Sequence, residues 1–234
     1  MSVNCHERSL YQQTFISRPS NRTQSMHEAR KLEAMKRIGL KWVIAVIAVL
    51  TFPAFAEDSG DQPGVRNCTW CHGTSAQGYT VAPRLAGQRP QYIENQIRNF
   101  RGHARDNPFS KQYMWSAVAS LSPNQARDLA EYFASLAPKA ANDGDQALAT
   151  RGKTIYLEGV PEANIVSCYA CHGPNAEGVR EIPRLGGLSY LYLKNRLQQW
   201  GQGYHASAAP MPMVASQLGP DEIEALASYL SFVR

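Results

Sequence analysis

Apolar residues recur at three- and four-residue steps in two separate stretches of the chain, a spacing that places them on one face of an α-helix. The two stripes are Ala126, Leu129, Phe133 and Leu136, and Ile223, Leu226, Leu230 and Val233. Ser122 suits the N-cap, Pro123 the first helical position, and Gln125 completes a capping box, so the first of these helices begins here. The second follows Pro220. Both stripes are expected to face a hydrophobic core.

Further helical patterns cover residues 90–100, 145–157 and 189–200, and no stretch carries a convincing strand pattern. The sequence therefore predicts an all-α fold.

An internal repeat divides the chain. Pro-Arg-Leu-Ala-Gly at 83–87 recurs as Pro-Arg-Leu-Gly-Gly at 183–187, an offset of 100, and residues 121–133 match residues 218–230 at an offset of 97. A Pro- and Gly-containing stretch separates the copies. We predict two copies of one small domain, at 57–137 and 145–234, joined by a linker at 138–144.

The first 56 residues are typical of a leader. A basic stretch at 35–41, an apolar run at 42–52 and Ala-Phe-Ala at 54–56 indicate a secretory signal peptide over 35–56. The run is shorter than the ~20 residues that span a membrane, so we expect cleavage before Glu57 and export to the periplasm. Residues 1–34 are predicted to be a non-native gene start or an extended leader. An uncleaved leader would give loose membrane association.

The formal net charge of +5 comes from this leader, which holds eight Lys and Arg against three acidic residues and leaves sixteen of each after it. A near-neutral mature chain has no electrostatic preference for nucleic acid. Its expected partners are proteins.

Two five-residue motifs carry the chemistry: Cys68-Thr-Trp-Cys71-His72 and Cys168-Tyr-Ala-Cys171-His172. Two thiols on one turn can reach the two vinyl groups of a haem, while the next imidazole coordinates the iron. Zinc sites and redox dithiols also use Cys-x-x-Cys, but they do not need a histidine at this position, and no strand–helix–strand pattern surrounds either motif. The motifs therefore predict two covalently attached haems c.

With one histidine bound, each haem iron has a sixth coordination position that needs a ligand. Met114 and Met211 each lie seven residues before a matching leucine, Leu121 or Leu218, so we predict both as axial ligands. Met213 fails this register and is the alternative at the second haem.

Two further histidines lie between motif and last helix. His103 and His205 are offset by 102, which matches neither register, so they are interpreted as solvated loop residues. Pairing of histidine with methionine at each iron raises the reduction potential and predicts a high-potential carrier.

The two motifs, the Pro-Arg-Leu-x-Gly segments and the methionine before each last helix together resemble the dihaem cytochromes c4, over nearly all of residues 62–234. This resemblance implies two tandem cytochrome c domains, each wrapped around one covalently attached haem, with haem propionates facing one another. It further implies that the carbonyls of Pro83 and Pro183 steady the ligating imidazoles. Arg84 and Arg184 would neutralise propionates or lie as ordinary surface arginines.

The function implied is periplasmic transfer of single electrons, from a quinol-oxidising complex or dehydrogenase to a terminal oxidase or reductase. The alternative is an electron-accepting dihaem subunit of a dehydrogenase, similar to that of flavocytochrome sulfide dehydrogenases. An enzyme would need an open iron position. Because both repeats present a methionine, we expect an electron-transfer protein and no catalytic residues.

One departure from the family concerns the first domain, which has only eleven residues between the expected cleavage site and Cys68. A full helix hardly fits there. We therefore expect the apolar face of the helix after Ser122 to be less covered and to offer a contact to the second domain or to another protein.

Overall fold

The computed structural model describes residue 30 and residues 63–79 and 81–234, and the fold discussed here lies in the compact unit Asp58–Arg234. The predictions for the leader, residues 1–34 and 35–56, lie outside the described residues. Within the described part of the chain there is no strand, and only three isolated bridges pair extended residues. None of the described helices is long and apolar enough to cross a membrane. The all-α prediction is confirmed.

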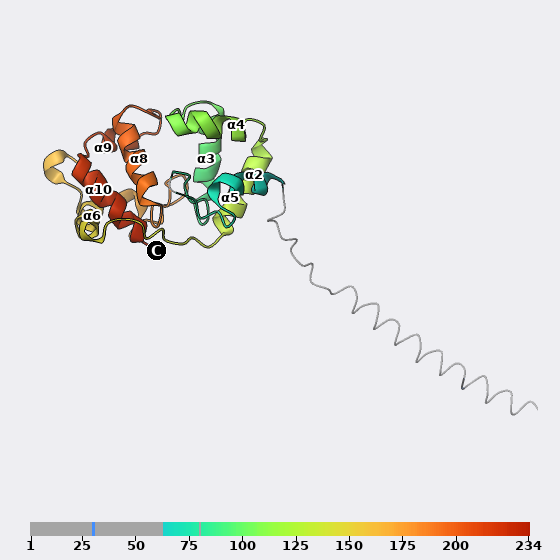
Figure 1. Ribbon diagram of the computed structural model, residues 1–234, viewed down its shortest axis with the longest axis horizontal. Helices are drawn as coiled ribbons and strands as arrows, with labels where there is room; N and C mark the ends of the chain where they lie inside the picture. Colours follow the sequence, from blue (N-terminus) through green and yellow to red (C-terminus); the bar gives the residue numbers. More distant parts are fainter. Residues whose placement is uncertain (1–29, 31–62, 80) are drawn as a thin grey trace, which may run out of the picture. The chain divides into compact units, whose positions relative to one another are not determined.

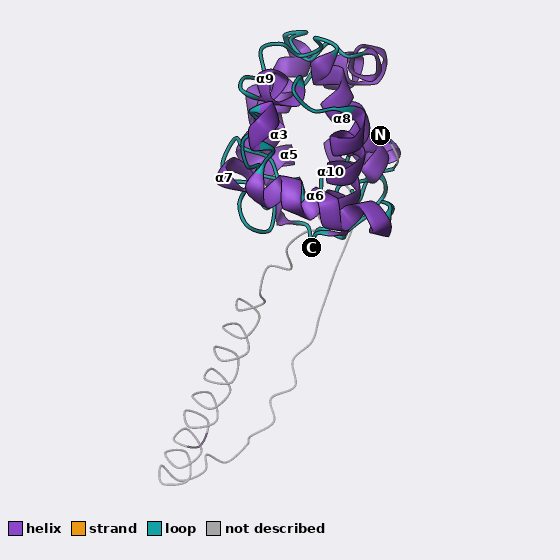
Figure 2. Ribbon diagram, turned by 90° about the vertical axis from the view of Figure 1, so that its left-hand side faces the viewer, coloured by secondary structure: helices purple, strands orange, loops and turns teal. Residues whose placement is uncertain are grey.

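The first half consists of α2 (Pro63–His72), α3 (Pro90–Arg101), the π-helical turn η2 (Ser110–Met114), α4 (Trp115–Val118) and α5 (Pro123–Ser135). The second half consists of α6 (Gln146–Glu158), the 3₁₀ turn η3 (Pro161–Ala163), α7 (Tyr169–His172), α8 (Tyr190–Gly201), α9 (Met211–Ala215) and α10 (Pro220–Phe232). Figure 1 shows the two groups of helices, and Figure 2 shows that helices and loops make up the described part of the chain. The predicted long helices agree with α3, α6 and α8 to within one residue.

Local sequence sets the starts of these helices. The predicted capping box at α5 is present, because the Ser122 side chain accepts from the Gln125 backbone N–H and the Gln125 side chain accepts in return. Ser189 and Asp145 cap α8 and α6 with side-chain oxygens. Proline at the first position starts α3, α5 and α10.

Each half has its own core, and both predicted apolar stripes lie in it. The buried core residues of the two last helices are Ala126, Leu129, Ala130 and Phe133 in α5, and Ile223, Ala225, Leu226, Ala227 and Leu230 in α10. Leu136 and Val233 are partly buried at the edges of the same cores. The two stripes therefore act as predicted.

The two halves differ in the helices at their N-terminal ends. In the second half α6 crosses α10 so closely that a Cβ atom on Gly152 would lie 2.0 Å from the Ala225 carbonyl oxygen. In the first half the ten-residue α2 contains the attachment motif itself and packs on α5, with Gly64 facing Leu129. Only residues 63–67 of α2 precede Cys68, so the described part of the first half has no separate helix like α6 before its motif. This agrees with the expectation that a full helix hardly fits there.

The same comparison overturns the expected uncovered apolar face on α5. Leu129 and Phe133 are 6% and 1% exposed. The face that α10 turns to α6 carries Ala225, and the matching position of α5, at the offset of 97, is the exposed Asp128. Because this face is charged, it needs no apolar cover.

Candidate haem sites

The four motif cysteines are free thiols placed alike in the two halves. Cys68 and Cys168 are half-buried and pack against their respective cores, whereas Cys71 and Cys171 are exposed. Burial raises the pKa of Cys68 and of Cys168 to about 11, with the paired cysteine adding to the effect at Cys68. The described residues contain no group of three or more His, Cys, Asp or Glu side chains placed to hold one metal ion. A zinc site built from the two motifs therefore has no geometric support.

Both motif histidines are buried and held by a proline carbonyl. His72 Nδ1 lies 2.7 Å from the Pro83 oxygen, and His172 Nδ1 lies 3.0 Å from the Pro183 oxygen. A carbonyl can only accept, so Nδ1 carries the proton and Nε2 keeps its lone pair for a metal. Burial lowers the pKa of both imidazoles, which favours the neutral form that ligates iron. The contact expected of the two prolines is present.

The methionines differ in exposure. Met114 ends the π-helical turn η2 and packs, partly buried, against the first core, which also contacts Cys68. Isolated π-helical turns are rare and often occur at functional sites. Met211 begins α9 and is partly buried, whereas Met213 is 70% exposed. Burial thus favours Met211 over Met213, as the register does, while ligation itself stays a prediction.

Arg84 is buried, and its hydrogen bonds do not support the expected contact with a haem propionate. Its Nη1 donates to the Lys139 and Gly187 carbonyls at 2.6 and 2.8 Å, and its Nη2 donates to the Gly186 carbonyl at 2.6 Å. These bonds join the first half to the linker and to the second half. The geometry therefore favours a role in joining the halves over contact with a propionate.

Arg184, at the matching position of the repeat, makes no such contact: its buried Nε has no acceptor. Instead its backbone pairs with Gln88, whose Oε1 accepts from the Arg184 N–H and whose Nε2 donates to the Arg184 carbonyl. The two arginines of the repeat are thus not equivalent.

Two buried guanidinium groups meet between the halves. Arg105 donates to the Gln96 side chain at 2.8 Å and to the Tyr192 hydroxyl at 3.2 Å, and it lies over the Phe100 ring. Arg196 lies over the Trp200 ring and is 2.7 Å from His205. Neither cation has a carboxylate partner among the described residues.

His205 is not the solvated loop residue that the sequence predicts. It is 3% exposed, its backbone N–H donates to Asp106 at 2.8 Å, and its ring also contacts Asn99. Burial, then the nearby Arg196 and Arg105, lowers its pKa to about 4. The correct repeat partner of His205 is Arg105, at the offset of 100.

The offset of 100 that pairs Arg105 with His205 can be read from the sequence alone. Gln96 and Arg105 in the first half match Arg196 and His205 in the second, and in each half the pair is hydrogen-bonded. In the first half the arginine is the later member of the pair, Arg105, whereas in the second half it is the earlier member, Arg196. Sequence reasoning missed these residues because it compared His205 with another histidine, His103, and not with the residue in register.

Buried nitrogen donors that lack an acceptor among the described residues suit the carboxylate of a haem propionate. Three buried nitrogens have no acceptor: Arg105 Nε, Arg184 Nε and Trp200 Nε1. Arg196 joins two of them, because it lies over the Trp200 ring and its charge interacts with that of Arg105. Buried donors without an acceptor are rare, and a carboxylate beside Arg105 and Trp200 would satisfy both while neutralising the buried guanidinium groups. A haem carries two propionates, so the thiols, the buried imidazoles and these two donors fit the prosthetic group that the motifs imply.

Comparison with known proteins agrees with this geometry. The pattern of the cytochrome c family matches residues 60–137 and 149–233. A thiosulfate dehydrogenase electron acceptor from Stutzerimonas stutzeri (strain A1501) is 34% identical over 210 residues, which cover 83% of this chain and 95% of that protein.

Solved structures show the same likeness. The cytochrome c4 of Acidithiobacillus ferrooxidans is 31% identical with a TM-score of 0.67, over 71% of this chain and 98% of that one. A thiosulfate dehydrogenase from Marichromatium purpuratum is 35% identical with a TM-score of 0.61, over 70% of this chain and 36% of that one. The chain belongs to the cytochrome c family and carries two of its haem-binding domains in tandem, as the cytochromes c4 do.

Proposed function

We propose that the chain holds two haems c and carries single electrons between proteins in the bacterial periplasm. Cys68 and Cys71 would hold the first haem by thioether bonds, with His72 and Met114 on its iron. Cys168, Cys171, His172 and Met211 would do the same for the second. The observation that carries this proposal is the repetition, in both halves, of the motif with its histidine buried on a proline carbonyl.

Haem iron supplies reversible one-electron oxidation and reduction. The chain's own residues fix the rest: the thiols set the position of the group, and the carbonyls of Pro83 and Pro183 set the orientation of each imidazole. Arg105 and Arg196 would neutralise the propionates between the halves. With a methionine on each iron, no position is open to a substrate, so we propose a carrier and not an enzyme.

The partners follow from the relatives and the leader. The signal peptide predicted at 35–56 supports export to the periplasm, where a quinol-oxidising complex or a dehydrogenase would be the donor and a terminal oxidase the acceptor. A second candidate is electron acceptor of a thiosulfate dehydrogenase. It is favoured by the 34% identity to a protein with that role and by the similarity to part of a thiosulfate dehydrogenase structure.

The test is the visible spectrum of the ferrous, periplasmically matured protein before and after addition of carbon monoxide, with haem content measured on the same sample. If each chain holds two haems and neither binds carbon monoxide, the carrier function is supported. One haem per chain, or ready gas binding by the unaltered protein, contradicts it.

The two candidates separate in a reconstituted assay. Thiosulfate with purified thiosulfate dehydrogenase, and separately quinol with a quinol-oxidising complex, are offered as reductants to the oxidised protein. Fast reduction by the first system alone supports the acceptor role, and fast reduction by the second alone supports the respiratory carrier.

A further inference from the structure

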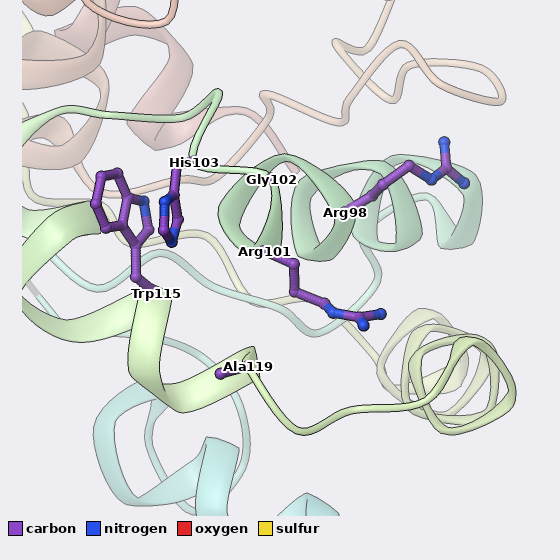
Figure 3. A pocket seen from close by; sticks show the side chains of 6 residues that line it. All are labelled: Arg98, Arg101, Gly102, His103, Trp115 and Ala119. Carbon is purple, nitrogen blue, oxygen red and sulfur yellow. The ribbon is translucent and has the colours of Figure 1, made fainter.

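A basic surface lies at the C-terminal end of α3, beside the first predicted haem. It surrounds a pocket of about 380 Å³ lined by Arg98, Arg101, Gly102, His103, Trp115 and Ala119 (Figure 3). Lys111 adds a further cation, with its Nζ 5.8 Å from the centre of the Trp115 ring. We call Arg98, Arg101, His103, Lys111 and Trp115 the α3 basic face.

The cations of this face form no ion pair with an acidic residue that the structure describes. Arg98 donates only to the neutral Asn95 side chain, at 2.8 Å, and neither Arg101 nor Lys111 has an ion pair with a described acidic residue. The nearby Asp106 accepts from the His205 backbone. Exposed cations without an acidic partner keep their charge available to an anion from outside.

The repeat shows that the fold does not require these charges. The residues that match Arg98, Arg101 and His103 at the offset of 100 are Gln198, Gly201 and Gly203. Residues 57–137 hold eight Lys and Arg against seven acidic residues, whereas residues 145–234 hold seven against eight. The positive charge is therefore concentrated on the first half.

The face is also rigid and close to the first iron site. The Trp115 indole N–H donates to the Arg105 carbonyl at 2.9 Å, and the ring stacks on His103 with centroids 3.8 Å apart. Trp115 directly follows Met114, the predicted ligand. Two exposed aromatic side chains, Phe109 and Tyr113, stand on the same short segment and are 41% and 53% exposed. Rigid aromatic contacts with a charged rim suit transient protein encounters.

We propose that the α3 basic face docks an acidic surface of a protein redox partner, and that this partner exchanges electrons with the first haem. The proposal rests on the proposed carrier function and adds to it the chemistry of the partner and the half at which it binds. The second half, with Gln198 and Gly201 in the same places, would not compete for this partner.

The experiment uses the haem-loaded full chain and the variant R98Q/R101Q, which removes two charges from the face. The control variant K153Q/R180Q removes two exposed charges from the second half. The first readout is binding: backbone amide resonances are recorded during titration with paramagnetic hexacyanochromate(III) and then with poly-L-glutamate. The second readout is the rate of oxidation of the ferrous protein by ferricyanide and by the cationic tris(phenanthroline)cobalt(III).

We expect both anions to act on the resonances of Arg101, His103 and Trp115, and R98Q/R101Q to abolish the effect. We expect this variant to slow ferricyanide by about three- to tenfold at low salt, an effect that disappears near 1 M salt, where the screening length is about 3 Å. The cobalt oxidant should not be slowed, and K153Q/R180Q should behave as wild type.

Equal slowing in both variants would mean that net charge alone matters and would overturn the proposal. Binding of hexacyanochromate without poly-L-glutamate would show a small-anion site and would also overturn it. The binding readout does not depend on electron transfer. Failure of the carrier function, seen as carbon monoxide binding by the wild type, is therefore distinguishable from failure of this face to bind anions.

Discussion

Replacement of Arg84 by methionine should uncouple the two halves. Arg84 is 5% exposed, and its guanidinium supplies hydrogen bonds to three carbonyls across the junction, those of Lys139, Gly186 and Gly187. Methionine has a similar length but no donor. In R84M the buried Gly186 and Ala86 carbonyls lose their donor, at a cost of about 1–3 kcal/mol each, or about 4 kcal/mol together. The Gly187 carbonyl keeps the Ala141 N–H, and Lys139 is exposed to water.

Part of this cost is offset, because the wild type holds a cation away from water. Burial, with a smaller effect of Arg184, lowers the pKa of Arg84 from 12.5 to about 10, which corresponds to about 3 kcal/mol. The net loss in R84M is therefore about 1 kcal/mol. For a unit of this size that loss lowers the Tm by about 2–4 °C.

The matched control is R184M, because Arg184 occupies the same place in the repeat and its Nε has no acceptor. We expect it to change the free energy of unfolding by less than about 0.5 kcal/mol. Both haem-loaded variants are unfolded in urea and followed by circular dichroism and by amide hydrogen exchange at the junction. Equal losses in R84M and R184M, or no loss in R84M, would refute the reasoning.

Three other predictions concern single sites. M114A should let one of the two ferrous haems bind carbon monoxide, whereas M213A should bind none; gas binding by M213A would instead assign Met213 to the second iron. G152A should destabilise by about 3 kcal/mol, because its Cβ would meet the Ala225 carbonyl, whereas G64A has 3.5 Å to Leu129 and should stabilise α2 by about 0.5–1 kcal/mol; thermal unfolding measures both, and a tolerated G152A would contradict the observed crossing. Because the pKa of His205 is about 4 when folded and near 6.5 when unfolded, stability should fall by up to about 3 kcal/mol from pH 6.5 to 4, and H205Q should lose this part of the pH dependence; urea titrations at both pH values check it, and an unchanged pH dependence would rule it out.

Repetition and periodicity were enough to predict most of the fold. The capping box at Ser122 and the stripes through Phe133 and Leu230 depend on local sequence, and the structure has them as expected. The prolines that hold His72 and His172 followed from the family resemblance, since a backbone carbonyl leaves no mark in the sequence.

The contacts between the halves could not be predicted in the same way. Arg84 has the same neighbours in sequence as Arg184, so only the relative placement of the two loops decides which one reaches across. His205 lies in a polar, Gly-containing stretch, which suggests a solvated loop. Its buried surroundings, however, include Asn99 and Asp106, which lie about one hundred residues away in the sequence. Long-range polar pairing of this kind has no periodicity to detect.

The one-sided contact of Arg84 has a consequence for how the halves relate as copies. In a dimer of identical domains every contact occurs twice, because a twofold axis repeats it. Here Arg84 reaches Gly187 without a counterpart, and Gln88 pairs with Arg184 while Leu188 stands in the matching place. The Arg84 and Gln88 side chains both belong to the first half, and the second half supplies only main-chain groups to them. A chimaera made of two second halves would place Leu188 where Gln88 stands and would lose the bonds of Gln88, so the duplicates are no longer interchangeable.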